Sequence, residues 1–133
     1  MNVDALIRYF HDLTPESVAR LAEFYTEDAF FKDPFNEVRG VEAIQRIFAH
    51  LFEQVAEPRF VVTERLADDD SAMLVWELRH GQGQRIRGVS HLRFADDGRV
   101  TYHRDYWDAA EELYMKLPVI GALMRSLRRA LRA

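Results

Sequence analysis

Apolar residues in the first half of the chain recur at helical spacing. They return every three or four positions over residues 3–10, which predicts an amphipathic helix. In the segment TPES that follows, Thr14 is suited to cap a helix and Pro15 to begin it, and apolar positions up to Tyr25 predict a second helix. Residues 41–55 repeat the pattern and predict a third helix that ends ahead of a proline.

The segment AFFKDPF, residues 29–35, breaks this helical pattern. It is short and aromatic and ends in a proline turn, which predicts a short strand leading into a loop. Later in the chain four segments of β character follow one another, at residues 59–67, 71–80, 84–95 and 99–107. The turn sequences DDD, GQG and DDG separate them, so they predict an antiparallel meander of four strands.

Helices followed by strands predict an α+β fold in which the helices pack against one face of a curved sheet. Alternation identifies the inner face of two strands. In residues 71–80 the inward set is Ala72, Leu74, Trp76 and Leu78. In residues 84–95, Ser90 is predicted to point inward and His91 outward.

The strand that contains YHRDYWD, residues 102–108, has polar groups on both faces. One face carries Thr101, His103, Asp105 and Trp107. A polar inner face indicates a polar-lined cavity rather than a sealed core. His103 and Asp105 lie two positions apart on the same face, so they are close enough to form a proton-shuttling pair. The alternatives are a buried ion pair that holds the pocket floor and a pairing of Asp105 with an arginine from a neighbouring strand.

Two other residues also allow two interpretations. Asp33 lies among phenylalanines and is a candidate base. Alternatively, its side chain caps backbone amides in the turn at Pro34. Tyr9 is either a phenolic donor inside the cavity or a core tyrosine that ties its helix to the sheet.

The last segment is a separate feature. Pro118 opens a predicted helix with an apolar stripe, and the arginines of this segment are Arg125, Arg128, Arg129 and Arg132, with no acidic residue. The arginines could form a solvent face. The helix could also dock on this domain or on a second subunit, or lie on an anionic membrane.

Composition excludes several classes of function and partner. A chain of 133 residues predicts one domain, and a net charge of -4 argues against nucleic acid as a partner. The absence of cysteine excludes disulfides and thiolate chemistry, and the five histidines are too scattered for a metal site. No apolar run reaches the ~18–20 residues of a membrane span, and the first residues do not resemble a signal segment, so a cytoplasmic location is expected.

Three motifs carry a family resemblance: YTEDAFFKDPF, the helix start GVEAI and the strand end HRDYWD. Together with the order of elements they resemble the NTF2-like superfamily, and most of all its SnoaL-like branch, over residues 1–110. The resemblance implies a cone, in which a curved antiparallel sheet and N-terminal helices enclose a pocket. Residues 111–133 are then a helical extension, expected to pack on the same domain. The family includes ketosteroid isomerases, polyketide cyclases, dehydratases and binding proteins, so the fold does not select a function.

The resemblance to ketosteroid isomerases rests on RYF and FKDPF. It implies Tyr9 as the oxygen donor and Asp33 as the base, 24 positions apart as in that family. The isomerases have a protonated aspartate at a third position, where SHLRF places Ser90. Serine is a weaker donor, so this departure argues against steroid isomerisation.

HRDYWD is similar to the catalytic WRDYFD of limonene-epoxide hydrolases, which makes Asp105 the counterpart of their aspartate. It also implies that His103 and Trp107 face the pocket. The hydrolases need a tyrosine, an asparagine and an arginine–aspartate pair that FFKDP and LVWEL do not offer, so their reaction is not expected here.

The sequence therefore predicts proton-transfer chemistry of the isomerase, cyclase or dehydratase type on an apolar ligand that bears a carbonyl or hydroxyl group. The candidate catalytic residues are Asp33, Tyr9, His103 and Asp105. The candidate substrate-binding residues are Phe30, Trp76, Ser90, Leu92 and Trp107. No cofactor or metal is expected, and the resemblance implies a homodimer. The alternatives are a non-catalytic binder of a hydrophobic ligand and an interaction protein that docks through its basic C-terminal helix.

Overall fold

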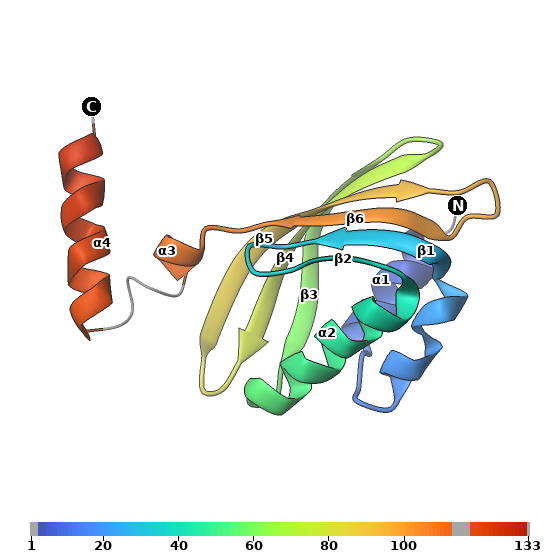
Figure 1. The fold of residues 1–133 in the computed structure, drawn as a ribbon, viewed down its shortest axis with the longest axis horizontal. Helices are drawn as coiled ribbons and strands as arrows, with labels where there is room; N and C mark the ends of the chain where they lie inside the picture. Colours follow the sequence, from blue (N-terminus) through green and yellow to red (C-terminus); the bar gives the residue numbers. More distant parts are fainter. Residues whose placement is uncertain (1–2, 113–117, 133) are drawn as a thin grey trace.

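The fold is an α+β arrangement of helices on one curved, open, mixed sheet (Figure 1). A computed structural model describes residues 3–112 and 118–132. The elements are α1 (Val3–His11), a 3-10 helix (Ser17–Glu23), β1 (Tyr25–Lys32), β2 (Glu37–Arg39), α2 (Val41–Gln54), β3 (Arg59–Ala67), β4 (Ser71–His80), β5 (Gln84–Phe94), β6 (Val100–Tyr106), α3 (Ala109–Glu112) and α4 (Pro118–Leu131). The sheet has the strand order β2-β1-β6-β5-β4-β3.

The predicted meander is confirmed, since β3, β4, β5 and β6 are antiparallel neighbours in sequence order. The predicted short aromatic strand is also present as β1. It pairs with β6 in the parallel direction, which the sequence did not indicate, and β2 pairs antiparallel on its other edge. The sheet is therefore mixed rather than wholly antiparallel.

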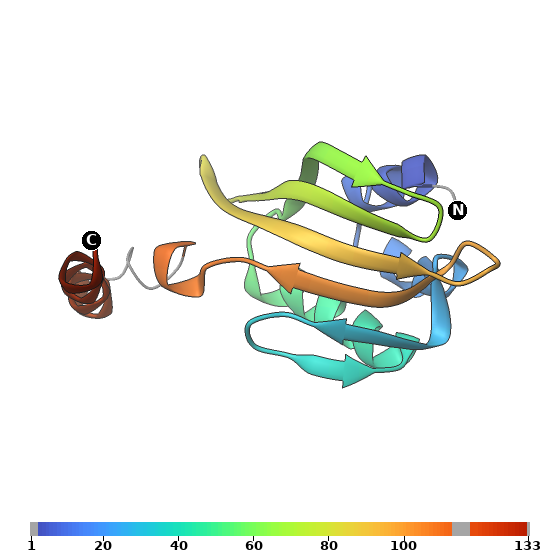
Figure 2. The ribbon, with the colours of Figure 1, turned by 90° about the horizontal axis from the view of Figure 1, so that it is seen from above.

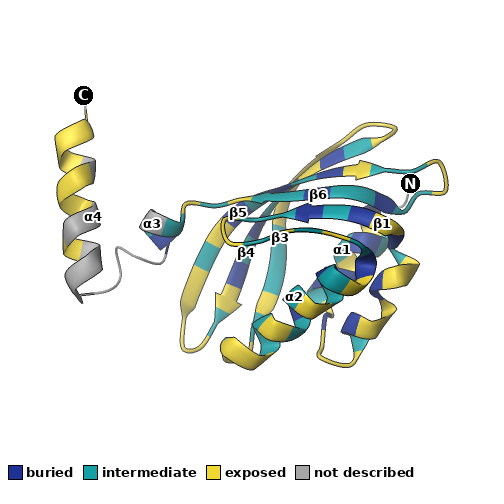
Figure 3. Cartoon of the chain, in the orientation of Figure 1, coloured by how far each residue is buried: buried dark blue, intermediate teal, exposed yellow. Residues whose placement is uncertain are grey.

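The helices α1 and α2 and the 3-10 helix cover one face of the sheet, as the two perpendicular views show (Figures 1 and 2). Apolar side chains at helical spacing face the sheet, with Leu6 and Phe10 on α1 and Ile44 and Phe48 on α2 all buried. They meet the inward residues of β4, and burial of this apolar area is the main source of stability. Along β4 buried residues alternate with more exposed ones, as expected for a strand with one covered face (Figure 3).

The second predicted helix is shorter than expected. The predicted start at Thr14 and Pro15 is also wrong: the Ser17 amide donates to the Thr14 hydroxyl at 3.0 Å, but Thr14 lies in the turn ahead of the helix, whose N-cap is Glu16 without a side-chain cap. The helix that follows is a 3-10 helix that ends at Glu23, and Tyr25 begins a strand instead of ending the helix. The backbone of Tyr25 pairs with Val100 of β6, so tertiary pairing overrides the local helical pattern.

Side-chain directions in the strands agree with the predicted inner faces, with one exception. Trp76 and Ser90 are buried, and His103 on β6 is 3% exposed. The exception is Thr101, because an irregularity in the β5–β6 pairing lets Val100 take the inner position in its place.

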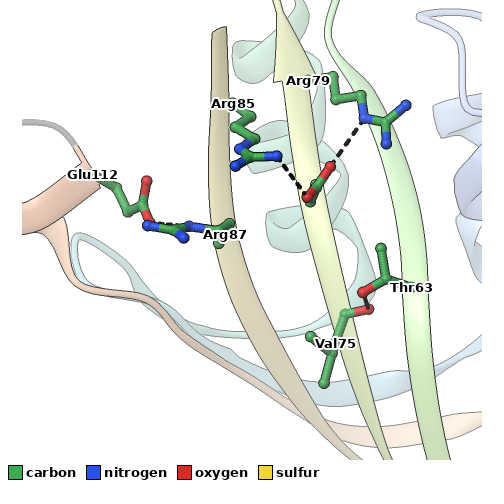
Figure 4. A network of polar contacts seen from close by, with 7 residues as sticks. Thr63, Val75, Arg79, Arg85, Arg87 and Glu112 are labelled. Atoms are coloured by element: carbon green, nitrogen blue, oxygen red, sulfur yellow. Dashed lines mark hydrogen bonds and ion pairs between the residues drawn. The ribbon is translucent and has the colours of Figure 1, made fainter.

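Beyond the sheet, α3 is held by ion pairs to the outer side of β5. The Arg87 guanidinium contacts Glu112 at 2.9 Å and Glu111 at 3.1 Å, and Figure 4 shows the Arg87–Glu112 contact. The helix predicted from Pro118 is confirmed as α4, while its packing on the domain stays a prediction. No helix among residues 3–112 and 118–132 is long and apolar enough to cross a membrane.

Candidate active site

A chain of hydrogen bonds runs through the interior of the sheet and begins at Tyr25. The Tyr25 hydroxyl on β1 lies 2.6 Å from Nδ1 of His103 on β6. Tyr25 is fully buried, and the parallel pairing of β1 with β6 brings the two strands together. On the other side of the imidazole ring, His103 Nε2 lies 2.6 Å from Oδ1 of Asp105. The predicted contact between His103 and Asp105 is therefore direct.

The chain continues from Asp105 to the next two strands. Across the β5–β6 pair, the Ser90 hydroxyl donates to Oδ1 of Asp105 at 2.5 Å. Across the β4–β5 pair, Nε1 of Trp76 donates to the Ser90 hydroxyl at 2.8 Å. Five side chains from four strands thus form one connected polar network inside an apolar core.

The donors and acceptors of this network constrain its proton positions. The indole N–H of Trp76 can only donate a hydrogen bond, and a carboxylate can only accept one. The Ser90 hydroxyl therefore accepts from Trp76 and donates to Asp105. His103 faces the carboxylate with a protonated Nε2, and in the neutral imidazole Nδ1 accepts from the Tyr25 hydroxyl. Both ring nitrogens of His103 are occupied, so the imidazole is not available to a ligand in this arrangement.

Burial raises the pKa of Tyr25 well above 10, and the negative charge of Asp105 raises it further. The phenol therefore keeps its proton, as its role as donor to His103 requires. Among the described residues, both hydrogen bonds to the Asp105 carboxylate go to Oδ1, and Oδ2 has no protein partner. Oδ2 is the one carboxylate oxygen of the network that a ligand could use.

Asp105 lies between two hollows. The inner hollow, of ≈ 30 Å³, is lined by Phe10, Phe48, Phe60, Val62, Leu74, Trp76, Ser90, His103 and Asp105. It has room for about one or two water molecules and not for a drug-sized ligand, which needs roughly 300–1,000 Å³. The outer cleft, of ≈ 550 Å³, lies at the ends of β1 and β6 and is lined by Lys32, Asp33, Pro34, Arg104, Asp105, Tyr106, Trp107 and Asp108. Of the two hollows beside Asp105, the outer cleft is therefore the one with room for a ligand of ordinary size.

Asp33 lines this outer cleft, but its carboxylate is engaged in the turn. Its Oδ1 accepts from the backbone amides of Phe35 at 2.8 Å and Asn36 at 2.7 Å. The Asn36 side-chain amide adds contacts to both oxygens of Asp33. This is the turn-capping arrangement that the sequence left open as the alternative to a base.

Tyr9 lines neither of these hollows. Its hydroxyl donates to the Ser17 carbonyl at 2.9 Å, and its ring stacks on Phe24 with centroids 4.4 Å apart. Burial raises its pKa to about 12. The geometry corresponds to the core tyrosine that ties α1 to the following segment, and it does not bring Tyr9 together with the network around Asp105.

The predicted apolar walls fall in different places. Trp76 lines the inner hollow, and Trp107 lines the outer cleft, where it makes an edge contact with Phe35. Leu92 is fully buried and lines neither hollow. Phe30 lies on the opposite face of the sheet from His103, so it does not fit its predicted role. Its ring stacks on Tyr102, and of the two neighbours Phe30 and Phe31 it is Phe31 that is buried.

Tyr25 is the member of the network that sequence reasoning missed. Its partner His103 is 78 positions away, and the local pattern assigned Tyr25 to a helix. Among the described residues, no group of three or more histidines, aspartates or glutamates could hold a metal ion.

A family model for the SnoaL-like domain matches residues 6–103. The chain belongs to the SnoaL-like family. No curated protein matches the sequence. Solved structures with this fold include a proposed SnoaL-like polyketide cyclase from Jannaschia sp. CCS1, with a TM-score of 0.71, 20% identity and coverage of 82% of this chain and 86% of that chain.

A proposed isomerase of the SnoaL-like family from Agrobacterium tumefaciens is similar as well, with a TM-score of 0.69, 15% identity and coverage of 80% of this chain and 93% of that one. An NTF2-like protein of unknown function from Cytophaga hutchinsonii gives a TM-score of 0.66 at 16% identity, covering 82% and 91% of the two chains. At such identities the likeness to these structures concerns the fold. The SnoaL-like sheet and its enclosing helices are thus the shared scaffold on which the network around Asp105 is built.

Proposed function

We propose that this SnoaL-like protein catalyses proton transfer on a small molecule that bears a carbonyl or hydroxyl group, with Asp105 as the base. The supporting observation is the placement of Asp105 between the buried network and the outer cleft, with Oδ2 free of hydrogen bonds to the described residues. The reaction would be of the isomerase, cyclase or dehydratase type, because each begins with removal of a proton next to a carbonyl or hydroxyl-bearing carbon.

In the proposed step, Oδ2 takes a proton from the ligand carbon, and the electron pair of the broken C–H bond moves toward the carbonyl oxygen. Ser90 and His103 hold the carboxylate through Oδ1, so its orientation is fixed before the ligand binds. Return of the proton to another carbon gives isomerisation. Attack of the carbanion on a second carbonyl gives cyclisation, with the proton passing from Asp105 to the new alkoxide. Departure of a hydroxyl group from the neighbouring carbon gives dehydration, and the proton from Asp105 leaves with it as water.

The outer cleft is the proposed ligand site because its volume suits a small organic molecule. Trp107 and Pro34 offer apolar contact there, and Lys32 and Arg104 offer positive charge to a developing oxyanion. This assignment replaces Tyr9, whose hydroxyl is bonded to Ser17.

Cyclohex-3-enone is a suitable first probe, because removal of its acidic proton and return to the far carbon gives a conjugated ketone that absorbs in the ultraviolet. The protein should accelerate this shift, and exchange of the same protons in D2O should be visible by NMR. Asp105→Asn should lower the rate by about 10²-fold or more, as is typical for loss of a general base. Asp33→Asn is the matched control, since it removes the other half-buried carboxylate of the cleft and should leave the rate unchanged. An active Asp105→Asn variant would refute the assignment.

A second candidate is a non-catalytic binding protein. The small volume of the inner hollow favours it, because the aromatic side chains already fill the space that a catalytic pocket would use. In that case Asp105→Asn would change the affinity for cleft ligands, and neither the wild type nor the variant would promote proton exchange.

A further inference from the structure

The helix α4 presents two different faces to solvent. Leu127 is 52% exposed and Leu131 is 77% exposed, and at four positions apart they lie on the same side of the helix. Arg125 and Arg129 are also four positions apart and exposed, and they lie two positions from the leucines, which is the opposite side of a helix with 3.6 residues per turn. The helix is therefore amphipathic in its described side chains and not only in its sequence.

Charge is distributed very unevenly between this helix and the rest of the protein. Residues 118–133 contain four arginines and no acidic residue, so they carry +4. Since the whole chain carries -4, residues 1–117 carry -8. The domain would be repelled by an anionic surface, whereas α4 would be attracted to it.

We infer that α4 is a docking helix for an anionic lipid surface. A protein groove would cover the leucines and gain nothing from the arginines on the far side. The interface of a bilayer accepts both, because leucine side chains enter the boundary of the acyl chains while arginine guanidinium groups reach the phosphates. A helix whose polar face only contacts water usually carries both positive and negative charges there, whereas the charged residues of α4 are all positive.

The length of α4 sets its orientation on the membrane. Fourteen residues at about 1.5 Å per residue give a helix of roughly 21 Å, shorter than the ~30 Å hydrocarbon core. The helix would therefore lie in the plane of the interface. Attachment would be reversible and sensitive to salt, because the arginines supply a large part of the attraction. The inference is independent of the proposed catalytic activity.

The test is co-sedimentation of the full chain with vesicles of phosphatidylcholine alone or of phosphatidylcholine with phosphatidylglycerol, at low and high salt. The protein should bind the anionic vesicles at low salt, and it should be released at high salt or when phosphatidylglycerol is left out. Leu131→Glu should reduce binding about tenfold or more, since it removes an inserted side chain and adds a repelled charge. The double variant Arg125→Gln, Arg129→Gln should also reduce it about tenfold or more.

Leu66→Glu is the matched control. Leu66 on β3 is 76% exposed, almost the same as Leu131, and it lies outside α4. This variant should bind like the wild type. Absence of binding to anionic vesicles, equal binding to neutral ones or an equal loss with Leu66→Glu would each overturn the inference. A fall in molecular mass on size exclusion with Leu131→Glu would also overturn it, because α4 would then join two copies of the chain.

Discussion

Gly88 lies directly opposite Trp76 in the β4–β5 pair, and the indole ring of Trp76 occupies the space where a side chain at position 88 would begin. A Cβ atom on Gly88 would lie 2.4 Å from Cζ2 and 2.5 Å from Cη2 of that ring. The glycine therefore lets the indole lie flat across β5, in the position from which Nε1 reaches the Ser90 hydroxyl.

Gly88→Ala should lower the free energy of unfolding by about 1–3 kcal/mol, because the new methyl group must displace a buried ring. The indole N–H signal of Trp76 in NMR spectra should shift as its bond to Ser90 is disturbed. Gly83→Ala, in the β4–β5 turn, meets no atom within 4 Å and should leave that signal unchanged, although its φ of +80 makes an alanine there somewhat strained. An unperturbed indole signal in Gly88→Ala would contradict the packing described.

Ser90→Ala should destabilise the protein by about 1–3 kcal/mol, because it leaves the buried indole N–H without an acceptor and removes one donor from Asp105. Thr63→Ala, which removes an exposed hydroxyl bonded to the Val75 carbonyl (Figure 4), should cost much less. Urea denaturation followed by tryptophan fluorescence measures both variants. Equal losses in the two would mean that the network around Asp105 adds nothing beyond an ordinary surface hydrogen bond.

Stability should fall at alkaline pH because of the buried phenols. In the folded protein the pKa of Tyr9 is raised to about 12 and that of Tyr25 well above 10, whereas the unfolded chain loses these protons near pH ~10. Above pH ~10 deprotonation therefore stabilises the unfolded state relative to the folded one, so the free energy of unfolding is unaffected by these phenols below that pH and declines as the pH rises toward the folded pKa values.

Tyr25→Phe isolates the contribution of one of these phenols. The variant should be less stable at neutral pH, because His103 Nδ1 loses its donor, but it should lose less stability than the wild type between pH ~9 and ~11. Urea unfolding across this range gives the two slopes. Parallel slopes would show that Tyr25 is not the buried, protonated donor described.

Asp33 should be a structural residue of the turn. Asp33→Asn keeps the oxygen that accepts from Phe35 and Asn36 and should change stability little, while Asp33→Ala removes it and should cost about 1 kcal/mol. Thermal denaturation compares the two. If both variants are equally stable and both lose activity on cyclohex-3-enone, Asp33 is the base and the turn is incidental.

Much of the fold followed from periodicity alone, because α1, α2 and the four strands from β3 to β6 are local patterns joined by short turns. The parallel β1–β6 pair could not be predicted in this way. Its strands are separated by most of the domain, and nothing in the segment around Tyr25 distinguishes a strand from the end of a helix.

In the site, too, residues placed by a local pattern could be predicted and the residue placed by long-range pairing could not. His103 and Asp105 were found because two positions along a strand place side chains on one face, and Ser90 was found from the alternation in β5. Tyr25 required the long-range pairing. For Asp33 and Tyr9 the sequence left two interpretations open, because a motif places a residue but does not say which group its side chain bonds. In the structure the partner of each side chain is a nearby backbone group.

The pairing of β1 with β6 also constrains the order in which the chain can fold during synthesis. The meander from β3 to β6 can form by successive hairpins, but the antiparallel pair of β1 and β2 cannot join the rest of the sheet until β6 has emerged from the ribosome. Until then the aromatic residues of β1 remain without their sheet partner, together with the helices that later cover it. The N-terminal part of this domain is made first and completed last.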